Sequence, residues 1–249
     1  YHIYDGRTSL GQKYDTIRLT NSFDGNGAII DVSHASFPIF DIMDDKTIVI
    51  KNLTILGSKS TGGGGAIYSG SHATTNLIDC TFINCSSSTK GGAVFMQGRG
   101  SLTNCIFINN HADGKDTYAG GAVYFQSGAS PGDSTSPPDY NNMVTDCTFI
   151  GNSAFADGGA LYVRYGIVTN CNFVNNKATG DINWGGAVNI YSGIVTKCNF
   201  TNNYVSEDGS AVYFSGRSGE VINCNFNNNS ASNDGGAVFI SRTGNVTIC

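Results

Sequence analysis

The chain is poor in charged residues, proline and long apolar runs. Only 13% of its 249 residues are charged, and four are proline. Its 14 Lys and Arg residues are scattered, which argues against a surface for nucleic acid or anionic membranes, since such surfaces need clustered basic side chains. No run approaches about 18 apolar residues, so we expect no membrane span in this fragment. We expect a piece of a longer secreted or anchored protein.

A repeated motif dominates the sequence. Cys-x-Phe-x-x-Asn is followed, after a polar turn, by Gly-Gly-Ala and an apolar residue, with a period of roughly 25 residues. Copies begin at Cys80, Cys105, Cys147, Cys171, Cys198 and Cys224, and Cys249 begins another. The motif's aromatic residues are Phe82, Phe107, Phe149, Phe173, Phe200 and Phe226, and its asparagines are Asn110, Asn152, Asn176, Asn203 and Asn229. Such a period predicts a solenoid in which one repeat forms one coil.

The apolar residues of each repeat alternate with polar ones, which is typical of strands. Cys171 and Phe173 should point into the core and Asn172 outward. We therefore predict an all-β fold, a right-handed single-stranded parallel β-helix of about nine to ten coils. Residues 1–46 should form an N-terminal cap and the first coils, and residues 47–249 the repeat body of the same domain. The Asn or Asp before each Cys, as at Asn170, should form a corner in the left-handed conformation.

The cysteines should form a column of free, buried thiols. Equivalent residues of stacked coils lie about 4.8 Å apart with parallel Cβ directions, which suits the near-90° disulfide torsion poorly. Cys85 stands where other repeats have Asn, and a Cys80–Cys85 bridge is an open alternative.

The outward positions and the flank loops are candidates for ligand binding. The residue between the two inward positions after Gly-Gly-Ala is mostly aromatic, and we expect an exposed column on one outer face: Tyr68, Phe95, Tyr124, Tyr162, Asn189, Tyr213 and Phe239. The rings of such a column either stabilise one another across neighbouring strands or form a surface that binds a ligand. Three extended loops, 111–119, 127–141 and 177–184, leave the coils. Tyr118, Tyr140 and Trp184 in these loops are the candidate anchors, with Tyr124 and Tyr162 on the aromatic face.

The paired motifs also carry a family resemblance. Gly121-Ala122-Val123 and Phe226-Asn227-Asn228-Asn229 resemble the repeats of polymorphic outer-membrane proteins and of adhesin-like surface proteins of methanogenic archaea. Residues 15–17, 27–31 and 49–54 are similar to the first coils of the archaeal proteins. This resemblance implies a right-handed parallel β-helix passenger, displayed outside the cell and used for attachment.

Few residues suggest catalysis or metal binding. Glycoside hydrolysis needs two facing carboxylates about 5 to 9 Å apart, and we find no same-face Asp cluster. Asp157, Asp208 and Asp234 precede the glycine pair, where Asp commonly caps a turn. The four histidines (2, 34, 72 and 111) share no repeat position with a Ser or Cys, so no nucleophile pair is expected. The loop 111–116 lacks the spacing of a calcium site. We expect no enzyme, no catalytic residues, no metal and no cofactor.

The preferred hypothesis is an extracellular, monomeric, adhesin-like β-helix. Its partner would be a surface glycan or protein of another cell, and nucleic acid is not expected as a partner. The alternatives are a carbohydrate-active β-helix enzyme, either a polysaccharide lyase or a hydrolase, and a passive structural stalk.

Overall fold

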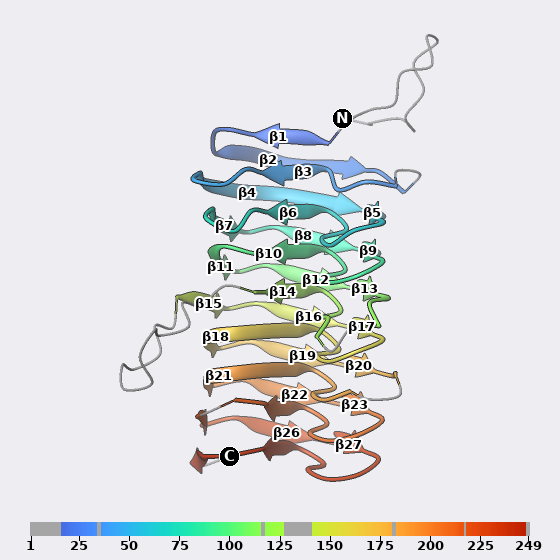
Figure 1. Ribbon diagram of the computed structural model, residues 1–249, viewed down its shortest axis with the longest axis vertical. Helices are drawn as coiled ribbons and strands as arrows, with labels where there is room; N and C mark the ends of the chain where they lie inside the picture. The colour runs from blue at the N-terminus through green and yellow to red at the C-terminus, as the bar shows by residue number, and fades with distance from the viewer. Residues whose placement is uncertain are drawn as a thin grey trace.

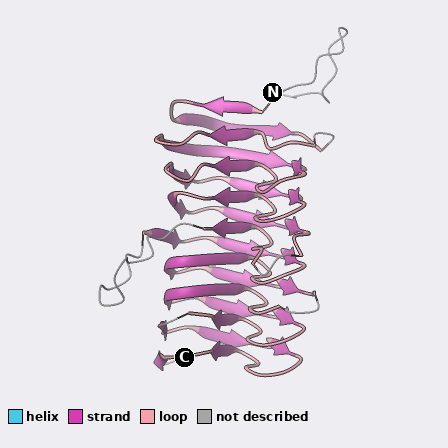
Figure 2. Ribbon diagram, in the orientation of Figure 1, coloured by secondary structure: helices cyan, strands magenta, loops and turns pink. Residues whose placement is uncertain are grey.

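The computed structural model is a stack of short parallel strands (Figures 1 and 2). It describes residues 16–33, 36–115, 118–126, 141–180, 183–216 and 218–247. Within these ranges all regular structure is strand, arranged as a β-solenoid of about eight turns. The predicted all-β solenoid is confirmed, and its handedness stays a prediction.

Equivalent strands of successive coils pair in parallel and in register, and they form four columns. The first column contains β1 (Ile17–Leu19), β3 (Phe40–Ile42), β6 (Ile67–Ser69), β10 (Val94–Met96), β14 (Val123–Phe125), β24 (Val212–Phe214) and β28 (Val238–Ile240). The second contains β7 (Thr74–Ile78), β11 (Arg99–Thr103), β15 (Asn142–Thr145), β25 (Gly219–Ile222) and β29 (Gly244–Thr247). The longer strands β18 (Leu161–Thr169) and β21 (Val188–Thr196) span these two columns.

The other two columns complete each coil. The third contains β8 (Thr81–Ile83), β12 (Ile106–Ile108), β16 (Thr148–Ile150), β19 (Asn172–Val174), β22 (Asn199–Thr201) and β26 (Asn225–Asn227), and β2 (Phe23–Asp31) and β4 (Thr47–Leu56) span the second and third. A separate seven-stranded sheet, here called the arm sheet, contains β5 (Lys59–Ser60), β9 (Ser86–Ser87), β13 (His111–Ala112), β17 (Ser153–Ala154), β20 (Lys177–Ala178), β23 (Tyr204–Val205) and β27 (Ser230–Ala231).

Two corners in left-handed backbone conformation separate these columns. The first lies at the residue before each cysteine, for example Asp146 with φ 55° and Asn170 with φ 53°, as the sequence predicts. The second lies before each ladder asparagine, for example Asn175 with φ 55° and Gly151 with φ 63°, and it was not predicted. Asn, Asp and Gly tolerate this conformation better than other residues, so the residue types follow from the corners.

The glycine pair lets successive coils come close together. The first glycine adopts a positive φ, as at Gly158 with 66°. A Cβ on the second, Gly159, would lie 2.0 Å from the carbonyl oxygen of Gly186 in the next coil. This close approach favours glycine at the second position, and among the copies only Ser210 departs from it.

Stacked phenylalanine rings fill the interior. The rings of Phe82, Phe107, Phe149, Phe173, Phe200 and Phe226 lie 4.8 to 5.1 Å apart between centroids, with interplanar angles of 4 to 7°. All except the half-buried Phe226 are fully buried. This Phe ladder confirms the inward position of the aromatic residue in the motif.

The seven cysteines of the described residues are free and buried. Cys80 and Cys85 are therefore not bridged. From coil to coil the amide of one cysteine donates to the sulfur of the next, as from Cys105 to Cys147 at 3.4 Å. The Cys147 thiol donates in turn to the Thr145 carbonyl at 3.1 Å. A thiolate could not donate this bond, so the contact favours the protonated form of the Cys147 thiol. Burial raises the pKa of the Cys85 thiol to about 12.

The motif asparagines form a second internal ladder. The Oδ1 of Asn152 accepts bonds from the amide of Asn110 at 2.9 Å and from its side-chain nitrogen at 3.0 Å. The Nδ2 of Asn152 donates to the Phe107 carbonyl at 3.0 Å and to the Oδ1 of Asn176 at 3.0 Å. The same bonds continue through Asn203 to Asn229. Cys85 begins the column, and its amide donates to Asn110.

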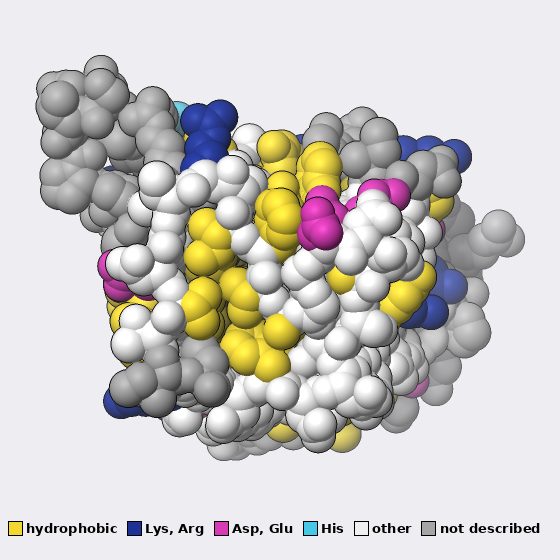
Figure 3. Space-filling model, turned by 90° about the horizontal axis from the view of Figure 1, so that it is seen from below, with side chains coloured by type: hydrophobic (Ala, Val, Ile, Leu, Met, Phe, Trp, Pro, Cys, Tyr) yellow, Lys and Arg dark blue, Asp and Glu magenta, His cyan; other side chains and the backbone are white. Residues whose placement is uncertain are grey.

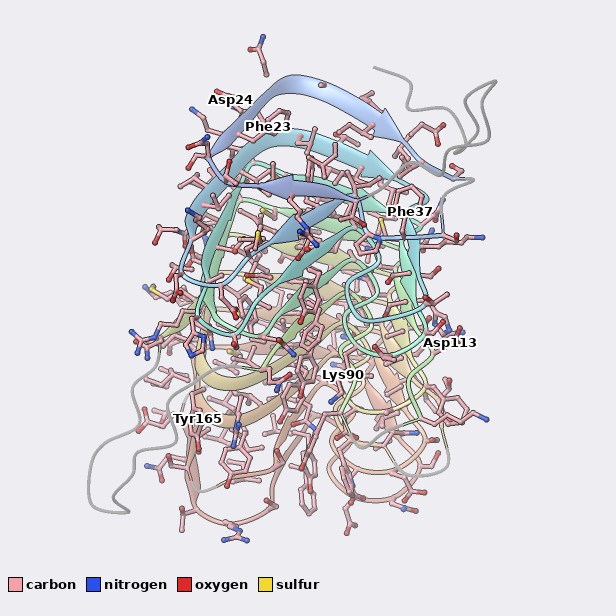
Figure 4. The ribbon with its side chains drawn as sticks, turned by 45° about the horizontal axis from the view of Figure 1, so that its top comes forward. Phe23, Asp24, Phe37, Lys90, Asp113 and Tyr165 are labelled. Carbon is pink, nitrogen blue, oxygen red and sulfur yellow. The ribbon has the colours of Figure 1, made fainter. Side chains whose placement is uncertain are left out.

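The two ends of the stack differ. At the N-terminal end Phe23 and Phe37 pack over the core (Figure 4), and the Phe23 ring lies 5.8 Å from that of Phe40. The C-terminal end exposes a hydrophobic patch (Figure 3), where Val238 and Ile240 of the last coil are only partly buried. No helix in the described part of the chain has the length and apolar character needed to span a bilayer.

Candidate functional site

An outward column runs along the first strands of the coils. Register pairs join its members through the whole stack: Arg18, Asp41, Tyr68, Phe95, Tyr124, Tyr162, Asn189, Tyr213 and Phe239. Its ring contacts include a stacked pair, Tyr124 and Tyr162, with centroids 4.7 Å apart. The register agrees with the sequence prediction and adds two charged residues at the N-terminal end.

The prediction that this aromatic face is exposed is wrong for most of its length. Tyr124 and Tyr162 are only 4% and 3% exposed, and Phe95 and Tyr213 are also buried. The segments between the arm sheet and the glycine pair, here called the covering loops, lie over the rings. A Cβ on Gly63 would lie 2.3 Å from the Phe95 ring, which shows how close such a loop comes. Strand alternation indicates that a side chain leaves the core, and it does not show whether a loop covers it.

Three covering loops each place a different side chain on a ring of the next coil. The ammonium group of Lys90 lies 5.2 Å from the centroid of the Tyr124 ring. Tyr118 packs on Tyr162 with centroids 4.9 Å apart. Lys90 is visible on the loop side of the molecule in Figure 4. Burial raises the pKa of Tyr124 to about 12, as expected for a phenol group that a covering loop shields from water.

The predicted anchors therefore form part of this cover. Trp184 stacks on Tyr213 with centroids 5.5 Å apart, and both Trp184 and Tyr118 are half-buried. Their coils are two steps apart in the register, as the sequence indicates. Tyr140 and most of the loop 127–141 lie outside the described residues. The structure thus places Tyr118 and Trp184 along one edge, each with one face against a ring and part of its surface exposed.

Asp157 and Asn189 interrupt this aromatic layer. Both are fully buried, and among the described residues the Oδ2 of Asp157 and the Nδ2 of Asn189 have no hydrogen-bond partner. The other carboxylate oxygen of Asp157 accepts from the Trp184 amide of the next coil at 2.9 Å, so this side chain links two coils, and its turn-capping role stays a prediction. Burial holds the pKa of Asp157 well above its usual range, because an ionised carboxylate would be poorly solvated there.

A Ser-His-Asp arrangement on the arm sheet corrects another prediction. His111 and Ser153 are register partners, so a histidine does share a repeat position with a serine. The Nδ1 of His111 lies 2.7 Å from Ser153 Oγ, and its Nε2 lies 2.6 Å from Asp113 Oδ1. The signal was in the sequence, because His111 and Ser153 each directly follow a ladder asparagine.

This arrangement has the contacts of a nucleophile, a base and an orienting carboxylate, and it lacks support for an oxyanion. The amides of Ser153 and Phe155 both donate to carbonyls of the preceding coil at 2.9 Å. Neither amide is available to stabilise a tetrahedral intermediate at Ser153. Asp113 is 67% exposed and lies at the outer edge of the molecule (Figure 4), so water would compete for each of these bonds.

A hollow of about 440 Å³ opens at the N-terminal end of the outward column. Its polar and aromatic lining consists of Arg18, Asp41, Asp44, Asp45, Tyr68 and Gln97. Sequence reasoning missed this hollow, because the turn 43–45 and the strand β10 approach one another only after the coils stack.

The metal prediction remains a prediction. Within the described ranges, no three His, Cys, Asp or Glu side chains are arranged to hold a metal ion.

Comparison with known proteins identifies the repeat type. Residues 104–126, 146–164 and 223–241 match the Chlamydia polymorphic membrane protein repeat. The chain is also 30% identical over 181 residues to "Probable autotransporter YfaL" of Escherichia coli (strain K12), an alignment that covers 59% of this chain and 14% of that protein. No solved structure matches the chain. These similarities support the polymorphic outer-membrane part of the resemblance and lend no support to the archaeal part.

The repeats and the fold together define the class of protein. They indicate a cell-surface or outer-membrane-associated protein that displays a β-helix of the passenger type. The chain spans about one seventh of the length of its autotransporter relative, so the activity of the whole protein is a matter for proposal.

Proposed function

We propose that this β-helix mediates attachment of the cell that displays it to another cell or to surface glycans, without a catalytic step. The observation that carries the proposal is the contrast between a constant interior and varied covering loops. The interior repeats Cys, Phe and Asn from coil to coil, whereas the loops carry Lys90, Trp184 and Asp208 directly before the glycine pair and Tyr118 one residue earlier. A partner can be discriminated only where side chains differ and reach the surface.

Tyr118 and Trp184 are the anchors in this proposal. Aromatic side chains offer a large contact area at a small cost in conformational entropy, and they are enriched at interaction hot spots. Each ring is already held by a ring beneath it, Tyr162 for Tyr118 and Tyr213 for Trp184. Such support fixes the exposed edge before a partner arrives, which lowers the entropy lost on binding.

The test is attachment of the purified chain to target cells or to a glycan array. The Tyr118→Ala and Trp184→Ala double variant should bind at least about tenfold more weakly, since each anchor is expected to contribute 1 kcal/mol or more. Tyr204→Ala is the matched control, because Tyr204 is 41% exposed on the arm sheet and lies outside the covering loops. Unchanged attachment by the double variant, with the melting temperature intact, would overturn the proposal for these loops.

A further inference from the structure

The hollow at the N-terminal end combines an aromatic ring with hydrogen-bonding groups of both kinds. Tyr68 is half-buried and packs against Phe95 with ring centroids 5.6 Å apart in an edge-on arrangement. Its hydroxyl donates to the Oε1 of Gln97 at 2.8 Å. Because this bond occupies the oxygen of the Gln97 amide, the amide N–H groups are left as donors at the hollow's edge.

The carboxylates of the hollow are held in place by neighbouring groups. Asp44 Oδ1 accepts from the His72 amide at 3.2 Å and from the Ser71 hydroxyl at 3.3 Å. Asp41 lies 3.8 Å from the guanidinium of Arg18, its register partner. The hollow thus presents acceptors, Asp41 and Asp44, together with donors from Arg18 and Gln97. Their positions are set by strands and a tight turn, which favours a preformed site.

We propose that this hollow binds an uncharged hexose unit of a glycan. A hexose carries several hydroxyl groups that both donate and accept, and carboxylate, amide and guanidinium groups satisfy them in pairs. Its apolar C–H face can pack on the Tyr68 ring, since tyrosine offers an apolar body with a polar tip. A volume of about 440 Å³ lies within the range of small-molecule sites. This inference rests on the proposed attachment function and names a ligand class for it.

The charge of the lining sets the specificity. Asp41, Asp44 and Asp45 carry three negative charges against the single positive charge of Arg18, so the hollow is net negative. A uronic acid, a sialic acid or a sulfated sugar would place an anion against these carboxylates and be rejected. The structure therefore predicts binding of neutral oligosaccharides and exclusion of acidic ones.

The first experiment measures binding of the purified chain to neutral and acidic hexose oligosaccharides on one array. Gln97→Ala should weaken binding of neutral chains about tenfold, since it removes the free donors without touching the core. Tyr68→Ala should weaken it at least as much, and the melting temperature separates this loss from unfolding. The matched control is Asp113→Asn, an exposed carboxylate outside the hollow, which should leave binding unchanged.

The second experiment reverses the charge selection. Asp45 has a φ of 62°, a conformation that asparagine also tolerates, so Asp45→Asn combined with Asp44→Asn removes two charges with little strain. This double variant should gain affinity for acidic oligosaccharides. If the native chain binds acidic sugars as well as neutral ones, binds no neutral hexose, or keeps full binding after Gln97→Ala and Tyr68→Ala, the inference is overturned.

These outcomes are separable from those of the attachment proposal. Loss of cell attachment on replacing Tyr118 and Trp184, with no effect of the hollow variants on any glycan, would sustain attachment and overturn the hexose site. Release of new reducing ends from a bound oligosaccharide would overturn the non-catalytic function, because a binding module leaves its ligand intact.

Discussion

The two aromatic columns of this β-helix lie on different strand columns and are stabilised differently: the inner one is on the third column and faces the core, and the outer one is on the first column and faces the covering loops. The inner column repeats phenylalanine through six coils, each ring parallel to the next. The outer column changes from tyrosine to phenylalanine to Asn189, and its ring pairs are edge-on in some coils and stacked in others. Each ring inside must match two identical neighbours, whereas each ring outside must match the loop that covers it.

This difference explains why one column is constant and the other varied. A change inside would leave a cavity against two coils at once. A change outside can be compensated by one covering residue, as Lys90 accompanies Tyr124 and Trp184 accompanies Tyr213. The following variants test this contrast.

The largest effect is expected from the inner Phe ladder. Phe149→Ala should lower the free energy of unfolding by about 3 to 5 kcal/mol, because the cavity lies between two fixed rings that cannot move into it. Chemical denaturation of the variant measures this. A loss below 1 kcal/mol would mean that the interior rearranges around the gap, contrary to a rigid ladder.

The Asn ladder should follow closely. Asn152→Ala leaves the Asn110 amide and the Phe107 carbonyl buried without partners, and we expect a loss of about 2 to 4 kcal/mol. Asn172→Ala provides the control, since Asn172 is exposed on β19 and should change stability by less than about 0.5 kcal/mol. Equal losses for the two variants would contradict the internal role of the ladder.

Asp157→Asn should raise stability at neutral pH. Burial holds the folded-state pKa of Asp157 above its unfolded value of 3.8, so the folded chain binds this proton more tightly. The stability that the protonated Asp157 carboxyl contributes is fully present below the pKa of the unfolded state. It is lost as the pH rises through the pKa of the folded state. Asparagine keeps an oxygen for the Trp184 amide and carries no charge. Melting curves from about pH 4 to pH 8 should show the variant's advantage growing with pH, and a constant difference would refute this account.

The smallest effect is expected in the covering loops. Lys90→Gln removes the cation above Tyr124 and should cost about 0.5 to 1 kcal/mol, as for a partly exposed cation–π contact. Lys59→Gln is the control, because Lys59 is exposed on the arm sheet. Chemical denaturation at low and high salt distinguishes the two variants. Equal losses in the free energy of unfolding would argue against a specific contact between Lys90 and Tyr124.

The repeat spacing was sufficient to predict the inner columns. Cys171, Phe173 and Asn176 recur at fixed offsets because in-register stacking requires the same residue to meet itself in every coil. The corner at Asn170 was predictable for the same reason. The second corner was missed although it left a signal, since glycine at position 151 replaces asparagine where a positive φ is required.

The exposure of the outward column and the position of the hollow depend on which segments pack over the coils. The period of the repeat does not predict this packing. Tyr124 and Tyr162 were predicted to be exposed because the alternation of apolar and polar residues shows which way a side chain points. It does not show whether a loop covers that side chain. The hollow around Tyr68 and Gln97 is formed by residues from separate coils and a turn. Its position follows from the stacking of the coils, and neither Arg18 nor Asp41 in its lining belongs to the repeated motif.

Thiol accessibility tests the central claim of a closed interior most directly. A Cys249→Ser variant leaves the seven described thiols, all of them free and buried. The account predicts that an aromatic disulfide reagent titrates almost none of them in the native protein and all seven after denaturation. Rapid reaction of most thiols in the native protein would contradict the closed interior, and with it the assignment of binding to the outer column and its loops.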